Sequence, residues 1–386
     1  MYSLSDYVWM IADRGRVDAY AAAIRAIVRP GDRVLDVGAG FGFFSIVAAR
    51  AGAAHVDAVD TNPVVRLGAR IAQANGCAGR IAFHHRDVRQ MTLPTRADVL
   101  IADVRGPTPF GRRSIEVIID ARRRLLRRGG RIIPCCDRVM VAPARTPAVF
   151  RREIHSAHGQ LGLDLTAAEE IVFDTPARCT IEPEDLVAEG QRWVTIDYNG
   201  VESADTDGTL EWSFKSATQV DGVGVWFETD LGAGCGFSTH PGGAVSTYKQ
   251  MFVPLRTPVR MDAGERVRVE LRIRQLGDNN VWAWRVWRIK QDGASDLVAD
   301  QNSLAEIILD PSTLPSTAST ASPALGPRGR ALATLLEGMD GTHSLGTLAA
   351  QLARDSPDLF PNARAATEFV SAWAHRMAQL ERGEEC

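Results

Sequence analysis

The sequence predicts an α/β protein with a doubly wound domain at residues 1–137, an antiparallel β-barrel at 138–310 and a small helical module at 328–386. Three observations lead to this prediction. In the first third of the chain, short apolar runs alternate with helical periodicity, as in parallel β–α–β units. Apolar and charged residues then alternate with a period of two, which is typical of half-buried strands. Residues 311–327, rich in Pro, Ser, Thr and Ala, predict a linker before the helical module.

The composition excludes several classes of protein. The 386 residues are 45% hydrophobic and carry a net charge of −3. This length allows two or three domains with sizeable cores, and the charge argues against general nucleic-acid binding. Six cysteines show no metal-ligand spacing, so no metal is expected. Because the chain has no membrane-spanning apolar run and no signal-peptide pattern, we expect a cytoplasmic protein without membrane contact.

The segment from residue 34 to residue 60 reads as a strand, a glycine turn, a helix and a second strand. Glycine is needed in such a turn because a Cβ would hold a ligand away from the backbone amides. Asp60 ends the second strand, where its carboxylate can accept both hydroxyls of a ribose. This order predicts a nucleotide-binding site. Its parts are Val34–Val37, Gly38, Gly40 and Gly42, Phe43–Ala51, and Val56–Val59.

The remaining elements follow from the same patterns. Helices are expected at Arg16–Ile27, Val64–Ala74 and Ser114–Leu126, and strands at Ile81–His84, Asp98–Ile101 and Arg131–Ile133. In the barrel region, Val267, Val269, Leu271 and Ile273 alternate with charged residues, and Trp282 and Trp284 are expected in the β core. In the last module, Ser344 is expected to cap a helix at Leu345–Leu352, and a second helix is expected around Ala363–Leu380.

The glycine spacing, Gly-x-Gly-x-Gly with Asp36 just before it, resembles the S-adenosylmethionine (SAM) version of the Rossmann-like motif rather than the dinucleotide version. A SAM domain followed by a β-barrel resembles the protein arginine methyltransferases, and this similarity covers roughly residues 7–310. Residues 236–255 are similar to the barrel segment with the Thr-His-Trp loop. Residues 157–170 stand where the family has its dimerisation arm, expected near 155–170, so the resemblance implies a homodimer.

The resemblance also implies SAM as the cofactor and assigns its contacts. MIADRGRVDAY at residues 10–20 is similar to a family helix whose arginine grips the cofactor carboxylate and whose methionine lies by the sulfonium. Two of the assigned residues have alternative roles, since Arg16 could be a solvated helix charge and Asp87 could cap the following turn. The expected cofactor-binding residues are Met10, Arg16, Asp36, Gly38, Gly40, Gly42, Asp60, Asp87 and Val88.

The acceptor site departs from the family pattern. Family members clamp a guanidinium between two glutamates, and ungapped placement of residues 102–122 puts Asp103 and Arg112 at those positions. A cation at Arg112 would repel a guanidinium; it could instead bind an acidic group or be a solvated charge. Glu116 could partly replace the second acid or pair with Arg112 on the helix surface. Asp103 could take a proton from a neutral nitrogen or a hydroxyl, orient it, or cap the loop.

Thr247 and Tyr248 stand where the family has its histidine and tryptophan, and Tyr248 could wall the acceptor pocket or pack in the barrel. The candidate catalytic residues are therefore Asp103, Glu116 and Tyr248. The candidate substrate-binding residues are Asp103, Arg112, Thr247 and Tyr248.

These residues predict a SAM-dependent methyltransferase that modifies nitrogen or oxygen in a peptide, protein or small molecule, other than ordinary protein arginine. Two alternatives stay open. The first is a non-catalytic SAM-binding scaffold, and the second is a divergent arginine methyltransferase in which Asp103 and Glu116 share the clamp. LLEGMDGTHSLGTLAAQL in the last module is similar to the small winged-helix chaperone of pyrroloquinoline quinone biosynthesis. That similarity implies a leader-peptide or protein partner at 328–386 and a role in peptide maturation; the alternative is a helical appendage.

Overall fold

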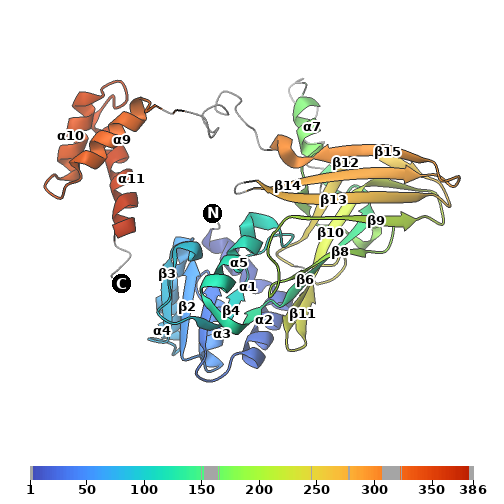
Figure 1. The fold of residues 1–386 in the computed structure, drawn as a ribbon, viewed down its shortest axis with the longest axis horizontal. Helices are drawn as coiled ribbons and strands as arrows, with labels where there is room; N and C mark the ends of the chain where they lie inside the picture. Colours follow the sequence, from blue (N-terminus) through green and yellow to red (C-terminus); the bar gives the residue numbers. More distant parts are fainter. Residues whose placement is uncertain are drawn as a thin grey trace. The chain divides into compact units, whose positions relative to one another are not determined.

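A computed structural model describes residues 3–148, 150–151, 166–244, 246–276, 279–306 and 324–381, together with Asp164 and Ser322. The chain forms two compact units, Met1–Ile307 and Ile308–Cys386, and each is described by itself (Figure 1). Most of the expected dimerisation arm and of the expected linker lies outside the described residues, so both stay predictions.

Five parallel strands form the sheet of the first domain, in the order β3–β2–β1–β4–β5. This confirms the predicted doubly wound sheet. The strand order reverses between β1 and β4, and ligands of such sheets bind outside the carboxyl ends of the strands at that point. The strands are β1 (Arg33–Val37), β2 (His55–Asp60), β3 (Ile81–His85), β4 (Ala97–Ala102) and β5 (Leu126–Ile133).

The helices predicted for this domain are present, and two of them differ clearly from the prediction. The predicted helix at 64–74 is divided into a 3-10 turn and a short α-helix at Gly68, where a Cβ would lie 2.1 Å from the Phe83 ring. The predicted helix from Ser114 ends at Arg124 because Leu126 already pairs with Ala97 in the sheet. The elements are α1 (Leu4–Ala12), which was not predicted, α2 (Arg14–Ile27), α3 (Phe43–Arg50), η1 (Pro63–Leu67), α4 (Gly68–Ala74), η2 (Val88–Gln90), η3 (Gly111–Arg113) and α5 (Ser114–Arg124).

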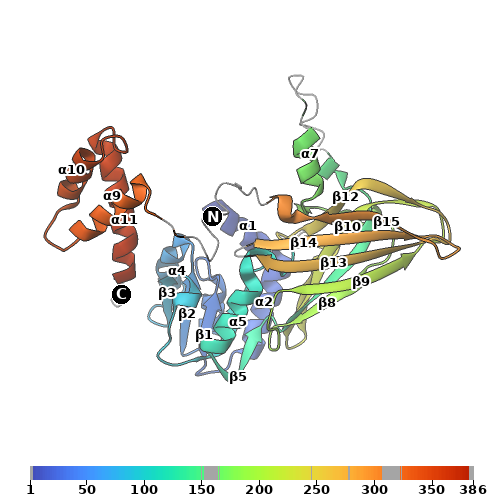
Figure 2. The same ribbon diagram turned by 45° about the horizontal axis from the view of Figure 1, so that its top comes forward.

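The second domain is built from two antiparallel sheets that meet along β12 and β15 and along β8 and β9. Figure 2 shows its long strands extending away from the parallel sheet. One sheet has the order β7–β12–β10–β6–β8 with β11 paired to β10, and the other has the order β15–β14–β13–β9. The elements are β6 (Cys136–Ala144), α7 (Thr166–Phe173), β7 (Ala177–Cys179), η5 (Pro183–Asp185), β8 (Gln191–Asp197), β9 (Thr206–Ser213), β10 (Thr218–Gly232), β11 (Cys235–Ser238), β12 (Gln250–Met261), β13 (Arg266–Leu276), β14 (Asn279–Ile289), β15 (Ser295–Asn302) and η6 (Ser303–Glu306).

The apolar residues of the predicted period-two pattern form the core of the barrel. Val267, Val269, Leu271 and Ile273 of β13 are fully buried, and Trp284 of β14 is nearly so. The Trp284 indole N–H donates to the Pro254 carbonyl at 3.1 Å. These side chains belong to one apolar cluster that also contains buried residues of β4 and α5. The barrel and the parallel sheet therefore share a core, which holds the end of β4 against the barrel.

The described part of the second unit contains three helices, α9 (Pro327–Gly338), α10 (Leu345–Asp355) and α11 (Ala363–Glu381), packed around their own core. Ser344 caps α10 as predicted, since its hydroxyl accepts from the Thr347 amide at 3.1 Å. Between residues 324 and 381 the structure has no strand, so it shows the helical part of the expected module and no wing.

Within the described residues, no helix is both long enough and apolar enough to cross a membrane.

We expect Leu100→Ala to lower the free energy of unfolding by about 2–5 kcal/mol, because Leu100 is fully buried in β4 and truncation leaves a cavity in the shared core. Urea unfolding followed by tryptophan fluorescence measures the change. Leu297→Ala on β15, where the side chain is 53% exposed, is the matched control and should stay within about 0.5 kcal/mol of the parent. Equal losses in both variants would contradict the shared core.

Candidate active site

A cavity of about 570 Å³ lies at the carboxyl ends of the parallel strands, next to the 246–248 segment of the barrel domain. It is the position that this sheet topology provides for a ligand. Nine of the predicted site residues line it together: Met10, Arg16, Gly38, Asp60, Asp87, Val88, Asp103, Thr247 and Tyr248.

The glycine turn fixes the Asp60 carboxylate at the cavity wall. The Gly40 amide donates to Oδ2 at 2.8 Å, and the Asn62 amide donates to Oδ1 at 2.7 Å. The carboxylate also lines the cavity, where it can accept from a ligand hydroxyl. Burial raises the pKa of Asp60, and the backbone hydrogen bonds oppose this shift. Gly40 has a φ of +56°, and a Cβ there would lie 2.7 Å from the ring of Tyr7, another cavity residue.

Three predicted cofactor residues, Asp36, Gly40 and Gly42, are not among the residues that line the cavity. Asp36 is buried beneath the turn, where it accepts from the Ser45 hydroxyl at 2.5 Å. Burial raises its pKa to about 7, although the Ser45 hydrogen bond favours the ionised form. Asp36 therefore connects β1 to α3 across the glycine turn, and Gly42, with a φ of +86°, is the N-cap of α3.

The predicted adenine end of the cavity begins at η2. The Asp87 carboxylate accepts from the Arg89 amide at 2.9 Å and forms an ion pair with the Arg89 guanidinium at 2.5 Å. These hydrogen bonds lower the pKa of Asp87. Asp87 therefore caps the turn, as in the alternative interpretation, and lines the cavity as well. Val88 is buried, and its carbonyl accepts from Arg124 Nη2 at 3.0 Å.

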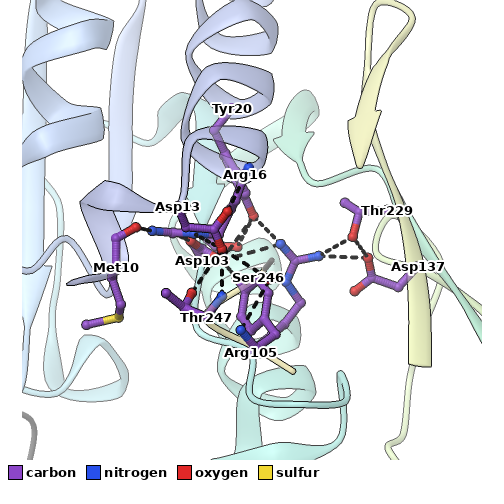
Figure 3. Close-up of polar contacts among 12 residues, drawn as sticks. Met10, Asp13, Arg16, Tyr20, Asp103, Arg105, Asp137, Thr229, Ser246 and Thr247 are labelled. Atoms are coloured by element: carbon purple, nitrogen blue, oxygen red, sulfur yellow. Dashed lines mark hydrogen bonds and ion pairs between the residues drawn. The ribbon is translucent and has the colours of Figure 1, made fainter. Parts of the chain in front are cut away.

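Arg16 projects from the first turn of α2 into the cavity wall. Its guanidinium forms an ion pair with Asp103 and donates to the Met10 carbonyl (Figure 3). Its side chain is 7% exposed, so Arg16 is not a solvated helix charge. Asp13 caps α2 by accepting from the Arg16 amide at 3.2 Å.

Asp103, at the end of β4, is bonded to four other side chains. Its Oδ2 pairs with Arg16, and its Oδ1 accepts from the Tyr248 hydroxyl and from Arg105 Nη2 at 3.3 Å. The Tyr20 hydroxyl lies 3.4 Å from the same Oδ1. Burial raises the pKa of Asp103, but the Arg16 and Arg105 charges and the Tyr248 hydrogen bond hold it below its ordinary value. Asp103 is thus a buried, ionised carboxylate, and it makes no loop-capping bond within the described chain.

Arg105 is a site residue that the sequence analysis missed. Its side chain is fully buried, and Nη1 pairs with Asp137 at 2.7 Å and donates to Thr229 at 2.9 Å. Figure 3 shows its guanidinium between Asp103 and the pair Asp137 and Thr229. The only available signal was its position two residues after Asp103. Nothing in the sequence indicated that Asp137 would lie beside it, because β6 and β4 come together only in the fold.

The 246–248 segment is held by Asp13, a second residue that was missed. Asp13 Oδ2 accepts from the Thr247 amide at 2.8 Å and from the Thr247 and Ser246 hydroxyls, each at 3.1 Å. Arg178 donates to the Tyr248 carbonyl at 3.2 Å. These contacts set the Tyr248 ring against Phe237, with the rings parallel and their centroids 6.0 Å apart.

The two remaining predicted residues lie on η3 and α5. Arg112 belongs to η3, and its side chain lies outside the described part of the structure, so its predicted contacts stay predictions. Glu116 stands in the first turn of α5 and is not among the cavity residues. Both of its carboxylate oxygens are buried and accept no hydrogen bond in the described chain.

Comparison with known proteins finds similarity over both domains. Residues 21–132 match the family described as "Ribosomal protein L11 methyltransferase (PrmA)". Residues 143–282 match the "Arginine methyltransferase oligomerization subdomain". The "Probable histone-arginine methyltransferase CARM1" of Oryza sativa subsp. indica is 29% identical over 276 residues, which are 67% of this chain and 52% of that protein. The chain therefore spans about half the length of that relative.

Two further proteins show the range of the similarity. The "Arginine N(omega)-methyltransferase" of Streptomyces achromogenes subsp. streptozoticus is 26% identical over 269 residues, 68% of this chain and 74% of that protein. The structure of the "Trypanosoma brucei PRMT1 enzyme-prozyme heterotetrameric complex with AdoHcy" superposes with a TM-score of 0.68. It is 23% identical and covers 77% of this chain and 97% of that one. At this identity the structural likeness establishes the fold, a parallel α/β domain followed by a barrel.

We expect the stability of the parent protein to fall as the pH rises from about 4 to about 7, relative to Asp36→Asn. In that range folded Asp36, whose pKa is about 7, holds a proton that the unfolded chain releases, so the contribution of Asp36 is lost with rising pH. One pKa unit corresponds to about 1.4 kcal/mol, which makes the difference a few kcal/mol above pH 7. Urea unfolding at several pH values measures it, and parallel pH profiles would show that Asp36 is not the responsible group.

Proposed function

We propose that this chain, which is related to the protein arginine methyltransferases over both domains of its larger unit, is a SAM-dependent methyltransferase. One observation carries the proposal. The cavity at the ends of the parallel strands brings together a fixed carboxylate, Asp60, a buried guanidinium, Arg16, and the carboxylate Asp103. An acid at the end of β2 suits a ribose, and a buried guanidinium suits a carboxylate.

The residues present fit this cofactor. Asp60 would hold the ribose, Asp87 and Val88 the adenine edge and Arg16 the carboxylate, with Met10 near the sulfur. Two features of the structure support the fit. Gly38 has a φ of +73°, and a Cβ there would lie 2.6 Å from Val104, so this turn at the cavity wall requires glycine. Arg16 also lines the cavity with a buried guanidinium, the kind of group that binds a carboxylate.

When bound, SAM supplies a methyl group on a positively charged sulfur. Methyl transfer is an in-line displacement, so the main task of the protein is alignment of the two reactants. Tyr248 and Asp103 form the wall at the acceptor end. The pKa of Asp103 is below its ordinary value, which makes it a weak proton acceptor at neutral pH. We infer that Asp103 orients the site and that the acceptor is nucleophilic without full deprotonation.

The acceptor we propose is a nitrogen or oxygen of a peptide, protein or small molecule, as expected from the loss of the second clamp acid. Residues 328–386 are the proposed partner site, for a leader peptide or another protein, which fits a role in peptide maturation. The support is that this module forms a separate compact unit with its own core. We further propose a homodimer, because residues 143–282 match a family described as an oligomerization subdomain.

A divergent arginine methyltransferase is the second candidate function. The observation in its favour is that the relatives reported above are named arginine methyltransferases. In this case Asp103 and Glu116 would share the clamp. The feature that favours this alternative is that both buried carboxylate oxygens of Glu116 accept no hydrogen bond from the described residues.

We expect the purified chain to bind SAM and its demethylated product, S-adenosylhomocysteine, and Asp60→Ala to weaken both affinities about 10- to 100-fold. The substitution removes the acceptor of the ribose hydroxyls, and a hydrogen bond to a charged group contributes about 1.5–3 kcal/mol. Isothermal titration calorimetry measures both ligands. Asp98→Ala is the control: Asp98 is at the opposite end of β4 and bonds the Arg33 amide. Failure of the parent chain to bind either compound would refute the cofactor proposal.

We expect methyl transfer from labelled SAM to at least one member of an acceptor panel, with and without residues 328–386 in the enzyme. The panel contains peptides of one sequence with Arg, Lys, Ser or Asp at the centre, free arginine, and a peptide preceded by a leader segment. Transfer to the uncharged or acidic members supports the main proposal, and methylarginine supports the second candidate. Tight cofactor binding without transfer to any member would favour the non-catalytic scaffold.

A further inference from the structure

Arg105 places a permanent cation inside the acceptor end of the site. Its side chain has no solvent exposure, and its guanidinium contacts two carboxylates, those of Asp137 at 2.7 Å and Asp103 at 3.3 Å. The Tyr20 hydroxyl accepts a further hydrogen bond from Nη2. A guanidinium stays protonated in proteins, so this charge is present at every working pH.

Four aromatic rings surround the same guanidinium. Its central carbon lies 5.3 Å from the centroid of Phe227, 5.6 Å from that of Phe237 and 5.7 Å from those of Tyr20 and Tyr248. At these distances a ring face attracts a cation. Carboxylates together with aromatic faces make a site for a guanidinium, and in this chain the guanidinium comes from the protein itself.

Arg105 also neutralises part of the charge of Asp103 by forming an ion pair with it. That carboxylate serves Arg16 and Arg105 at once and accepts from Tyr248 as well. Asp137 is occupied by Arg105, Thr229 and the Tyr198 hydroxyl, the last at 2.6 Å. Asp13 is a third buried acid, 3.9 Å from Arg16 Nε, but it does not line the cavity. The two acids that contact Arg105 are thus both already paired with buried arginines, and neither is free for an incoming cation.

We propose that Arg105 determines which acceptors enter: it excludes a cationic acceptor and selects one whose reacting group carries no positive charge. This inference rests on the methyltransferase function proposed above and concerns the acceptor of that same site. A cation next to Arg105 would be repelled in a desolvated setting, where juxtaposed like charges are strongly unfavourable. Arg105 acts through Asp103 and the surrounding charge, so it is a positioning residue.

The test compares two probes that differ in charge and little in shape, Nα-acetyl-L-arginine methylamide and Nα-acetyl-L-citrulline methylamide. Their affinities for the full chain saturated with S-adenosylhomocysteine are measured by calorimetry. The parent chain should bind the arginine probe no more tightly than the citrulline probe. Arg105→Met combined with Asp137→Asn removes one cation and one anion together, which limits the loss of stability from an unpaired buried charge. This double variant should shift the preference toward arginine by about tenfold or more.

Arg131→Met is the matched control, because Arg131 forms an ion pair with Asp32 at 2.7 Å and does not line the cavity. It should leave the ratio of the two affinities unchanged, as should Arg105→Lys, which keeps the charge. A parent chain that prefers arginine about tenfold, or a folded double variant whose ratio does not move, would overturn the inference. If the double variant does not fold, the ratio in the parent chain decides. Binding of S-adenosylhomocysteine is measured first, so failure of the cofactor proposal is seen separately.

Discussion

The shared ion pairing of Asp103 is the interaction on which the acceptor end of this protein depends. One carboxylate at the end of β4 holds Arg16 of α2 on one side and Arg105 on the other, and it accepts from Tyr248 of the barrel domain. A buried charge is tolerated only when it is paired and hydrogen-bonded. The parallel sheet, the N-terminal helices and the barrel must therefore meet at this point, or several ionised groups would lie buried without partners.

Backbone contacts form one end of the cavity, and side-chain contacts form the other. At the proposed cofactor end the backbone dominates: the amides of Gly40 and Asn62 fix Asp60, and an added Cβ at Gly38 or Gly40 would clash with its neighbours. At the acceptor end nearly every contact is made between side chains that come from different elements. Turn geometry restricts the first arrangement to a few residue types, whereas charge balance restricts the second only as a set.

The similarity to arginine methyltransferases is therefore greater at the cofactor end of the cavity than at the acceptor end. The fold resembles that of the arginine methyltransferase relatives, and the glycine turn and the acid at the end of β2 match the pattern expected from the sequence. At the acceptor end, the placement proposed from the sequence puts Asp103 and Arg112 where that family has two acids, and Tyr248 where it has another aromatic residue. Arg105 adds an internal guanidinium. A fold can host several acceptor chemistries because the acceptor groups lie on loops and strand ends outside the common core.

The sequence by itself determined the parallel sheet, the barrel strands and the turn that presents Asp60, because each depends on local periodicity or on a conformation that few residues adopt. The close approach of the Phe83 ring to Gly68 was not predictable, since the two residues lie on different elements. Only the tertiary structure decided that Asp36 bonds Ser45 of α3 and that Asp13 holds Thr247, a residue 234 positions away in the chain. It likewise decided that Arg105 lies between Asp103 and Asp137. Long-range ion pairs leave no periodic signal in the sequence, because any two positions that the fold brings together can form them.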